Sequence, residues 1–351
     1  MSYKSCTRRF IAALCIFIAL NFLVWNIWTE QLLTDSDGLG GDLARTGYIT
    51  GIKQPRRAYT DLPRHHIEFQ DYHDQPVDVL TIGDSFSNGG GGGKNSFYQD
   101  YIATENNMSV LNIGMLSQNQ GPLSTLVVLN NSGYLDIIKP KVILLQSAEK
   151  TVIERLGRIT TFDDTRRIED IKRFYKEHRE NPTYLPPVKF INTGNVKFLY
   201  YSLIYRFKDS VNGKVIVRKL SKPLFSTKLD STLVFWHDDI RNLPKQTPEA
   251  VNLLNDNLNR MADLLATKGI KLYFMPAVDK YNLYRDYIID NPYPESRLFE
   301  TMRTLPKKYT LIDTKAILAK ALSNGKKDIY YADDTHWSWK ATELIFNEVR
   351  F

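Results

Sequence analysis

VDVLTIGDS, residues 77–85, is the stretch of this 351-residue chain that decides its fold. It is short, apolar and rich in β-branched residues, and it ends in a turn, as a buried parallel strand does. Gly83 allows the chain to turn sharply, so that Ser85 would enter the following helix with its hydroxyl exposed. Open α/β sheets place their active sites at the carboxyl ends of such strands. The stretch therefore predicts a parallel sheet that presents Ser85 at its functional edge.

Four later runs have the same texture as this strand. They are SVLNIGM from Ser109, KVILLQS from Lys141, IKLYFMPAVDK from Ile270 and YTLIDT from Tyr309. Helical patterns separate several of them, and the clearest covers Pro248 to Lys268, with Thr247 as its cap. The β-α-β-α order predicts an α/β fold, a three-layer α/β/α sandwich with a central parallel sheet of the flavodoxin-like kind.

The amino-terminal region contains an almost uncharged apolar run from Phe10 to Trp28. At about 1.5 Å per residue, a helix of this length spans roughly 28 Å and can cross a bilayer. Basic residues precede the run and acidic residues follow it: Lys4, Arg8 and Arg9, then Glu30, Asp35, Asp37 and Asp42. The positive-inside rule then predicts a cytoplasmic amino terminus and export of the rest of the chain.

A cleaved signal peptide is the alternative interpretation of this run. No small-x-small cleavage site follows Trp28, which favours an uncleaved single-pass anchor in the cytoplasmic membrane, with the remaining chain periplasmic or extracellular. The two cysteines, Cys6 and Cys15, lie in or before the anchor, so the exported part has neither a disulfide nor a thiolate nucleophile.

The rest of the chain divides by composition. Residues 1–31 are expected to form the cytoplasmic tip and anchor, 32–74 a stalk with the first loops of the domain, and 75–351 a catalytic domain. A basic, aromatic-rich segment at about 157–246 breaks the strand-helix rhythm and is interpreted as an insertion, either part of a binding site or a solvated lid. With 46 basic and 39 acidic residues the net charge is +7, which favours anionic partners such as acidic glycans or phospholipid headgroups; nucleic acid is not expected for an exported domain.

A serine hydroxyl is a weak nucleophile and needs a base. Among the six histidines, His336 has the most suggestive setting, YYADDTHW, just before the predicted last helix. A carboxylate one to three residues earlier, Asp334 or Asp333, could hold its tautomer and stabilise the imidazolium. The sequence thus offers Ser85, His336 and one of two acids for nucleophilic catalysis.

These residues resemble the blocks of the SGNH hydrolase superfamily, and within it the alginate O-acetyltransferase branch, the AlgJ- and AlgX-like proteins. The resemblance rests on Gly83-Asp84-Ser85, Asn112-Ile113-Gly114 and Asp334-Thr335-His336-Trp337, with weaker echoes at Glu149-Lys150 and at Pro276 to Tyr281. It covers about residues 77–157 and 247 to the end, and it leaves the insertion uncovered.

The resemblance implies that Ser85 is the nucleophile, His336 the base and Asp334 the orienting carboxylate. Other SGNH enzymes use the acid three positions before the histidine, so Asp333 stays open as the alternative. The expected oxyanion donors are the backbone amides of Ser85 and Gly114. The superfamily usually adds an asparagine after the third strand, but this chain has Gln146 to Glu149 there, which disfavours a lipase-like esterase.

Three other features of the sequence bear on ligand binding. The glycine run 89–93 fails the phosphate-loop pattern and is expected to form a loop beside the nucleophile. Trp337 and Trp339 flank the base and could stack on sugar rings or belong to the core. No histidine cluster has metal-ligand spacing, so neither a metal nor another cofactor is expected.

The leading hypothesis is therefore an extracytoplasmic O-acetyltransferase that moves acetyl through an acetyl-serine onto a cell-surface or exported polysaccharide. By resemblance, a membrane-embedded partner would supply the acetyl group, because acetyl-CoA is absent outside the cytoplasm. An acetyl-esterase with the same triad and a non-catalytic glycan-binding scaffold of an export complex are the alternatives. The glycan, the acetylated hydroxyl and the donor are not named by the sequence.

Overall fold

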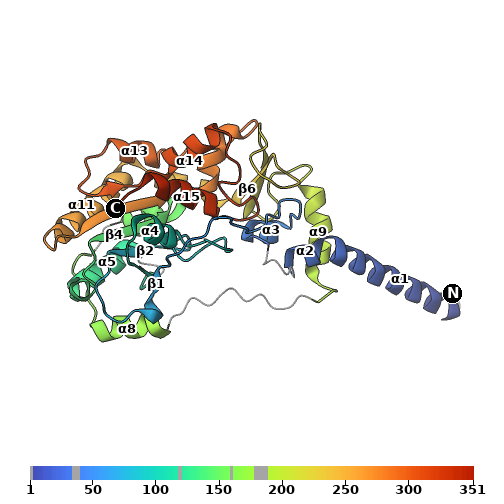
Figure 1. Cartoon of the computed structure of the whole chain (residues 1–351). Coiled ribbons are helices and arrows are strands. Elements are labelled where there is room, and N and C mark those ends of the chain that lie inside the picture. The colour runs from blue at the N-terminus through green and yellow to red at the C-terminus, as the bar shows by residue number, and fades with distance from the viewer. Residues whose placement is uncertain (1–2, 34–39, 118–120, 159–160, 178–188) are drawn as a thin grey trace.

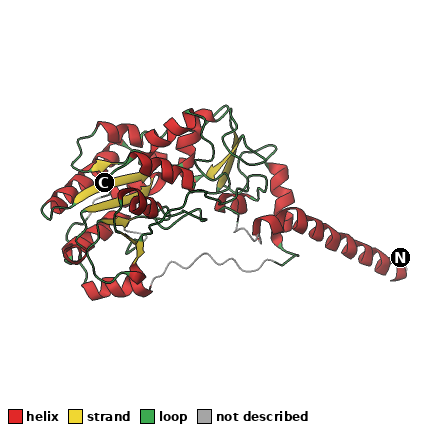
Figure 2. Ribbon diagram, viewed as in Figure 1, coloured by secondary structure: helices red, strands yellow, loops and turns green. Residues whose placement is uncertain are grey.

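The computed structural model describes residues 3–33, 40–117, 121–158, 161–177 and 189–351, and it places the predicted strands in one sheet. The sheet has six strands in the order β1-β3-β2-β4-β7-β8, and every neighbouring pair is parallel (Figure 2). The strands are β1 (Ile67–Glu68), β2 (Val79–Ile82), β3 (Val110–Ile113), β4 (Val142–Ala148), β7 (Lys271–Ala277) and β8 (Thr310–Leu311). The prediction of an α/β fold with a central parallel sheet is confirmed.

Helices cover both faces of this sheet. Every residue of β2 and β4 is buried, and because successive side chains point to opposite faces, both faces must be covered. One group of contacting helices is α4 (Tyr98–Asn106), α14 (Thr314–Ser323) and α15 (Trp339–Glu348); the other is α5 (Gly121–Asn131), α7 (Glu149–Leu156) and α11 (Pro248–Ala266) (Figure 1). Smaller elements around them are η2 (Phe69–Asp71), α6 (Leu135–Ile138), α12 (Lys280–Tyr284), η4 (Arg285–Tyr287) and α13 (Leu298–Thr304).

The predicted helix from Pro248 is confirmed at its start. Thr247 caps α11, its side chain accepting a hydrogen bond from the amide of Ala250, and Pro248 occupies the first turn. The helix ends at Ala266, two residues before the predicted Lys268, and Gly269 follows with φ +72°. Its apolar stripe, which includes Leu254, Leu258 and Met261, is buried against the sheet.

The chain reverses its direction across the sheet next to β2. From β2 it crosses to β3 on one side, whereas β4 pairs with the other side of β2. Ile82 is level with Ile113 and Leu145, so the loops that follow these three strands meet at one edge. In open α/β sheets ligands bind in the crevice at such a switch point.

The amino-terminal helix projects away from the α/β unit (Figure 1). It comprises α1 (Tyr3–Val24), the π-helical turn η1 (Trp25–Thr29) and α2 (Glu30–Leu33), and the segment from Tyr3 to Thr29 is long and apolar enough to cross a membrane. The predicted span from Phe10 to Trp28 lies inside it.

The insertion predicted at about 157–246 contains its own small elements. They are α8 (Ile168–Glu177), α9 (Thr193–Ile204), the antiparallel hairpin β5 (Val215–Lys219) and β6 (Thr232–Trp236), α10 (Asp238–Arg241) and η3 (Leu243–Lys245). Residues 159–160 and 178–188 of the insertion lie outside the described residues.

The segment interpreted as a stalk contributes more to the domain than the sequence indicated. Residues 34–39 are not described, but from Gly40 onwards α3 (Asp42–Gly47) packs against the β5–β6 hairpin, the Ala44 amide donates to the Asp333 carbonyl at 3.0 Å, and β1 is added to the edge of the sheet. A two-residue strand has no alternation to detect, and so sequence periodicity missed it.

Candidate active site

Ser85, His336 and Asp334 form a continuous chain of polar contacts. Ser85 Oγ lies 2.7 Å from His336 Nε2, and His336 Nδ1 lies 2.7 Å from Asp334 Oδ1. Ser85 is exposed, whereas the side chain of His336 is largely buried and that of Asp334 is 9% exposed. The fold thus brings together two residues 251 positions apart, in the arrangement that activates a serine hydroxyl.

The turn that carries Ser85 is fixed by buried side chains. A Cβ on Gly83 would lie 2.0 Å from Ser87 Oγ, so only glycine fits there. Gln146 Oε1 accepts hydrogen bonds from the Asp84 amide and from Ser87 Oγ, both at 3.0 Å. Asp84 in turn accepts a hydrogen bond from the Ala148 amide at 2.7 Å. These contacts tie the serine turn to the end of β4.

Asn112 supports the same turn from β3. Its Oδ1 accepts a hydrogen bond from Thr81 Oγ1 at 2.8 Å, and its Nδ2 donates to the Ser87 carbonyl at 3.0 Å. Gly114 follows Ile113, the register partner of Ile82, and a Cβ on Gly114 would meet nothing within 4 Å. Its backbone therefore borders open space at the strand edge that carries Ser85.

Gln146, in the part of β4 that the sequence resemblance matches to an oxyanion block, has a different environment from an oxyanion donor. It is completely buried, and its carbonyl oxygen holds the serine turn. The predicted oxyanion donors therefore stay the amides of Ser85 and Gly114.

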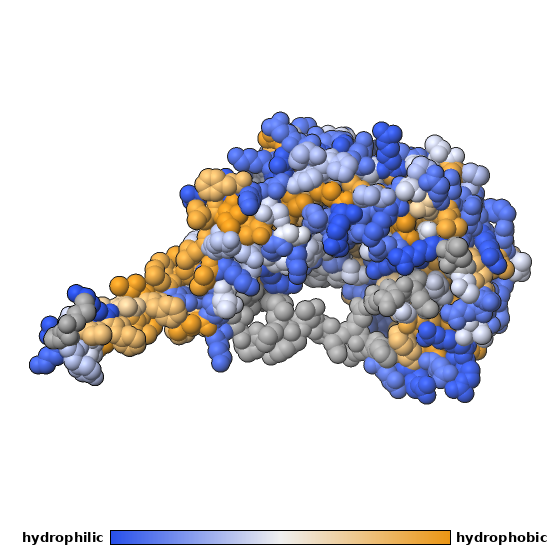
Figure 3. Space-filling model, turned by 180° about the vertical axis from the view of Figure 1, so that it is seen from behind, coloured by the Kyte–Doolittle hydropathy of each residue, from blue (hydrophilic) through white to orange (hydrophobic). Residues whose placement is uncertain are grey.

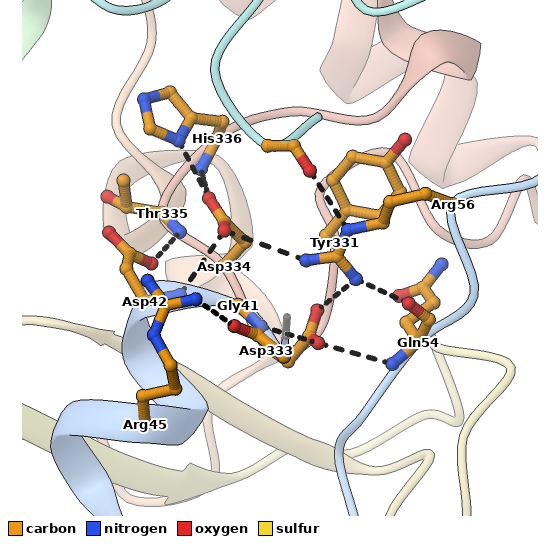
Figure 4. Close-up of polar contacts among 12 residues, drawn as sticks. Gly41, Asp42, Arg45, Gln54, Arg56, Tyr331, Asp333, Asp334, Thr335 and His336 are labelled. Atoms are coloured by element: carbon orange, nitrogen blue, oxygen red, sulfur yellow. Dashed lines mark hydrogen bonds and ion pairs between the residues drawn. The ribbon is translucent and has the colours of Figure 1, made fainter. Parts of the chain in front are cut away.

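Of the two candidate acids, Asp334 contacts the imidazole, whereas the alternative, Asp333, holds other partners. Its carboxylate is completely buried and accepts hydrogen bonds from the amides of Gly41 at 3.0 Å and Gln54 at 3.3 Å (Figure 4). It also forms an ion pair with Arg56 at 2.7 Å. Asp333 thus holds the segment that follows the amino-terminal apolar helix.

Arg56 links three parts of the site (Figure 4). Besides pairing with Asp333, its Nε donates to the Gly91 carbonyl at 3.0 Å, and its guanidinium lies 4.2 Å from the centre of the Tyr331 ring. One guanidinium nitrogen is 3.6 Å from Asp334 Oδ2. Sequence reasoning missed Arg56 because nothing in its irregular surroundings distinguishes it from other surface arginines.

The glycine run lies directly against the imidazole. A Cβ on Gly90 would come within 2.3 Å of His336 Cδ2 and 2.5 Å of Nε2, and the Gly90 amide donates to the Ser85 carbonyl at 2.8 Å. A Cβ on Gly93 would come within 2.4 Å of Arg56 Cβ. The prediction of a loop beside the nucleophile is confirmed, and its lack of side chains leaves room for the base.

Lys280 binds the backbone of the histidine loop, residues 331–336, which carries His336. Its ammonium group donates to the carbonyls of Tyr331 at 2.8 Å, Ala332 at 2.9 Å and Asp334 at 3.1 Å. Burial lowers the pKa of Lys280 to about 8, although Asp333 and Asp334 oppose the change. A cation saturated by main-chain carbonyls serves to fix the loop.

The ionisation of the site is set by burial and by the contact between His336 and Asp334. Burial lowers the pKa of His336, but the hydrogen bond and charge of Asp334 outweigh it, so the pKa lies above 6.5. Burial would raise the pKa of Asp334, whereas His336 and Arg56 together hold it well below its usual range. The acid therefore stays ionised and stabilises an imidazolium.

Asp42 adds a second carboxylate behind the imidazole. Its Oδ1 accepts a hydrogen bond from the Thr335 amide at 2.8 Å, and burial, reinforced by the charge of Asp334, raises its pKa. Potential metal-ligand atoms of Asp42, Asp334 and His336 lie within 4.8 Å of one another. Asp334 and His336 bond each other, and Asp42 accepts from the Thr335 amide. Hydrogen bonding therefore explains why these three side chains lie together, without a metal ion.

The two tryptophans beside the base have different environments. Trp337 is 3% exposed and packs edge-on against Phe86, with ring centres 4.8 Å apart, so the sugar-stacking prediction is wrong for it. Trp339 begins α15 and donates from Nε1 to the Arg57 carbonyl at 2.8 Å; it is partly exposed. A sugar-binding role for Trp339 stays a prediction.

A cavity of about 630 Å³ lies away from these residues, between α9, the β5–β6 hairpin and Trp28. No member of the triad lines it. Substrate at Ser85 would therefore occupy the open strand edge.

No known family model matches the chain, and no curated protein matches it significantly. The class of the site therefore rests on its geometry, an exposed serine at the switch point of a parallel sheet with a histidine and an aspartate aligned behind it. This arrangement is typical of serine-dependent acyl transfer.

Proposed function

We propose that this chain is a membrane-anchored serine O-acetyltransferase of the SGNH type that acts on an exported polysaccharide. The alignment of Ser85, His336 and Asp334, with both polar contacts at 2.7 Å, carries the proposal. Acyl transfer needs a nucleophile, a base and an orienting acid in this order. The choice of acetyl and polysaccharide comes from the resemblance of the three sequence blocks.

In the first half-reaction Ser85 attacks the donor acetyl group. Its Oγ bonds to the carbonyl carbon while its proton passes to His336 Nε2, and Asp334 stabilises the imidazolium. The amides of Ser85 and Gly114 would donate to the oxyanion. Collapse of the tetrahedral intermediate breaks the bond to the leaving group, which receives the proton from His336, and acetyl-serine remains.

The second half-reaction repeats these steps with a sugar hydroxyl. His336 accepts the hydroxyl proton as the sugar oxygen bonds to the acetyl carbon, and breakage of the serine ester returns that proton to Ser85 Oγ. The polysaccharide gains one acetyl group and the site is restored.

The anchor supports an extracytoplasmic location for this reaction. The helix from Tyr3 to Thr29 has the length and composition of a membrane span, and the preceding basic residues favour a cytoplasmic amino terminus. A partner embedded in the same membrane would then deliver acetyl to Ser85.

An acetyl-esterase is the second candidate, supported by the exposure of Ser85. Water can reach an exposed acetyl-serine as a sugar hydroxyl can, and the same base would activate it. The acceptor therefore has to be determined by experiment.

The test uses the full-length protein in detergent with 4-nitrophenyl acetate, with and without acetylatable glycan. Ser85→Ala should remove both nitrophenol release and the mass gain of one acetyl group, whereas Ser221→Ala, at an exposed loop serine, should retain both. Glycan that gains acetyl supports the transferase, and release unaffected by glycan supports the esterase. Turnover that persists in Ser85→Ala would exclude the triad, and no turnover in the wild type with several acetyl donors would favour a glycan-binding scaffold.

A further inference from the structure

Helix α9 of the insertion packs across the outer end of the membrane helix (Figure 1). The Trp28 and Phe198 rings stack with their centres 5.9 Å apart and an interplanar angle of 22°. Asn195 is 2% exposed, and its amide bonds two anchor residues, accepting from Thr29 Oγ1 at 2.7 Å and donating to Asn21 Oδ1 at 3.0 Å. One face of α9 is therefore built onto the anchor.

The contact with Asn21 sets the depth of α9. Asn21 lies inside the apolar segment, eight residues before Thr29, which corresponds to about 12 Å along a helix. A polar side chain in a membrane span needs a partner, and Asn195 provides it. The first turn of α9 therefore lies beside residues 21–29 of the anchor, the part that would enter the bilayer from its outer surface.

Another face of α9 is apolar and exposed among the residues that the structure describes. Its large side chains recur at three- and four-residue spacing and continue just beyond the helix: Val196, Leu199, Tyr200, Leu203 and Phe207, which are 64%, 49%, 57%, 56% and 81% exposed. We call these five residues the α9 stripe. Apolar surface gathers on this part of the molecule beside the anchor in Figure 3. An exposed apolar surface of this kind, next to a helix long enough to span a membrane, is a candidate for contact with lipid.

Basic side chains border the α9 stripe. Lys197, Arg206 and Lys208 are exposed. Helices that lie in the plane of a bilayer interface combine an apolar face with such basic residues, which attract anionic headgroups.

We propose that α9 lies in the outer lipid–water interface, with the α9 stripe in contact with lipid. The proposal rests on the membrane anchor included in the proposed function. Lipid is the expected occupant of this face because α9 packs directly on the anchor and because basic side chains border the stripe. The bilayer then holds the chain at two places, α1 and α9, which fixes the orientation of the α/β unit on the membrane.

Site-directed spin labelling of the full chain tests this placement. In a Cys6→Ser, Cys15→Ser background, single cysteines are introduced by Leu199→Cys or Leu203→Cys and labelled with a nitroxide in phosphatidylcholine–phosphatidylglycerol vesicles. Collision with oxygen, which concentrates in lipid, is compared with collision with a water-soluble nickel chelate. Leu20→Cys, on the exposed surface of the anchor, and Leu264→Cys, on the exposed surface of α11, are the references.

At both α9 positions the ratio of oxygen to nickel collisions should shift towards that of Leu20→Cys and well above that of Leu264→Cys. Ratios equal to that of Leu264→Cys would overturn the proposal, as would immobile labels that neither reagent reaches, because those indicate a protein partner. A water-like ratio at Leu20→Cys would remove the anchor and this proposal together. Acetyl transfer is assayed separately, so loss of the catalytic proposal alone would leave these ratios unchanged.

Discussion

Asp333 and Asp334 are neighbours in the sequence, yet their carboxylates hold different partners. Asp334 Oδ1 lies 2.7 Å from the imidazole of His336, whereas Asp333 Oδ1 pairs with Arg56 at 2.7 Å. The two residues lie in a turn that directs their side chains to different partners: Asp334 leads to the nucleophile, and Asp333 leads to the segment after the amino-terminal helix. The two acids should therefore differ in what their loss does to the protein.

Asp334→Asn should reduce kcat by about 10³–10⁴-fold, because an amide neither fixes the tautomer of His336 nor stabilises its imidazolium. The free energy of unfolding should fall less than in Asp333→Asn, because Asp334 lies 3.6 Å from Arg56 whereas Asp333 lies 2.7 Å from it. The measurement is kcat for nitrophenyl ester release together with a urea unfolding curve.

Asp333→Asn is the matched variant and should mainly reduce stability, with a smaller loss of kcat than Asp334→Asn. It breaks a buried ion pair, which costs about 3–5 kcal/mol of the free energy of unfolding. Equal kcat losses in the two variants at equal stability would contradict the division of roles.

The pH dependence should report the base. The pKa of His336 is raised above 6.5, and only the neutral imidazole accepts the serine proton. kcat/KM should therefore be low in acid and rise as the pH passes through this raised pKa. Asp42→Asn removes one of the charges that raise it, so its profile should move to lower pH. A wild-type inflection well below 6.5, or an Asp42→Asn profile shifted to higher pH, would argue against His336 as the base.

Gly90→Ala should inactivate the protein by a steric effect. The added Cβ would come within 2.5 Å of His336 Nε2, and a displacement of the base of about 1 Å can cost about 10²-fold in rate. Gly92→Ala is the control: its Cβ meets nothing within 4 Å, and its φ of +68° costs about 1–2 kcal/mol of stability without touching the base. Activity should be compared at a temperature where both variants are folded, and equal activities would show that the glycine run does not constrain His336.

The sequence predicted the parts of the molecule whose physical pattern is local. The strands at β2, β3, β4 and β7 are apolar runs bounded by turns, and α11 has a cap and a periodic stripe. The pairing of Ser85 with His336 also followed, because residues at the carboxyl ends of parallel strands and their loops meet at one edge.

Other parts depend on contacts that no local pattern encodes. The choice between Asp333 and Asp334 is decided by Arg56 and Gly41, which come from a segment without periodicity. Trp337 is adjacent to the base in the sequence but faces Phe86 in the core. Side-chain direction in a loop follows its tertiary partners, and sequence spacing does not determine it.

Lys280→Met tests whether the histidine loop depends on the buried ammonium group. The substitution keeps most of the side-chain volume but leaves the carbonyls of Tyr331, Ala332 and Asp334 without this donor. Each buried carbonyl that loses its donor costs about 1–3 kcal/mol of the free energy of unfolding. Part of this cost is offset because the substitution also removes a charge that burial disfavours, as the lowered pKa of Lys280 shows.

We therefore expect the free energy of unfolding to fall by about 3 kcal/mol, measured with urea on the full chain in detergent. Lys340→Met is the control, because Lys340 pairs with Asp328 but is 38% exposed, and it should cost at most about 1 kcal/mol. A loss in Lys280→Met no larger than in Lys340→Met would mean that the loop is held by its other contacts. If kcat fell while the stability of Lys280→Met stayed unchanged, the ammonium group would act on the charge of the site, since a support for the backbone has to contribute to folding.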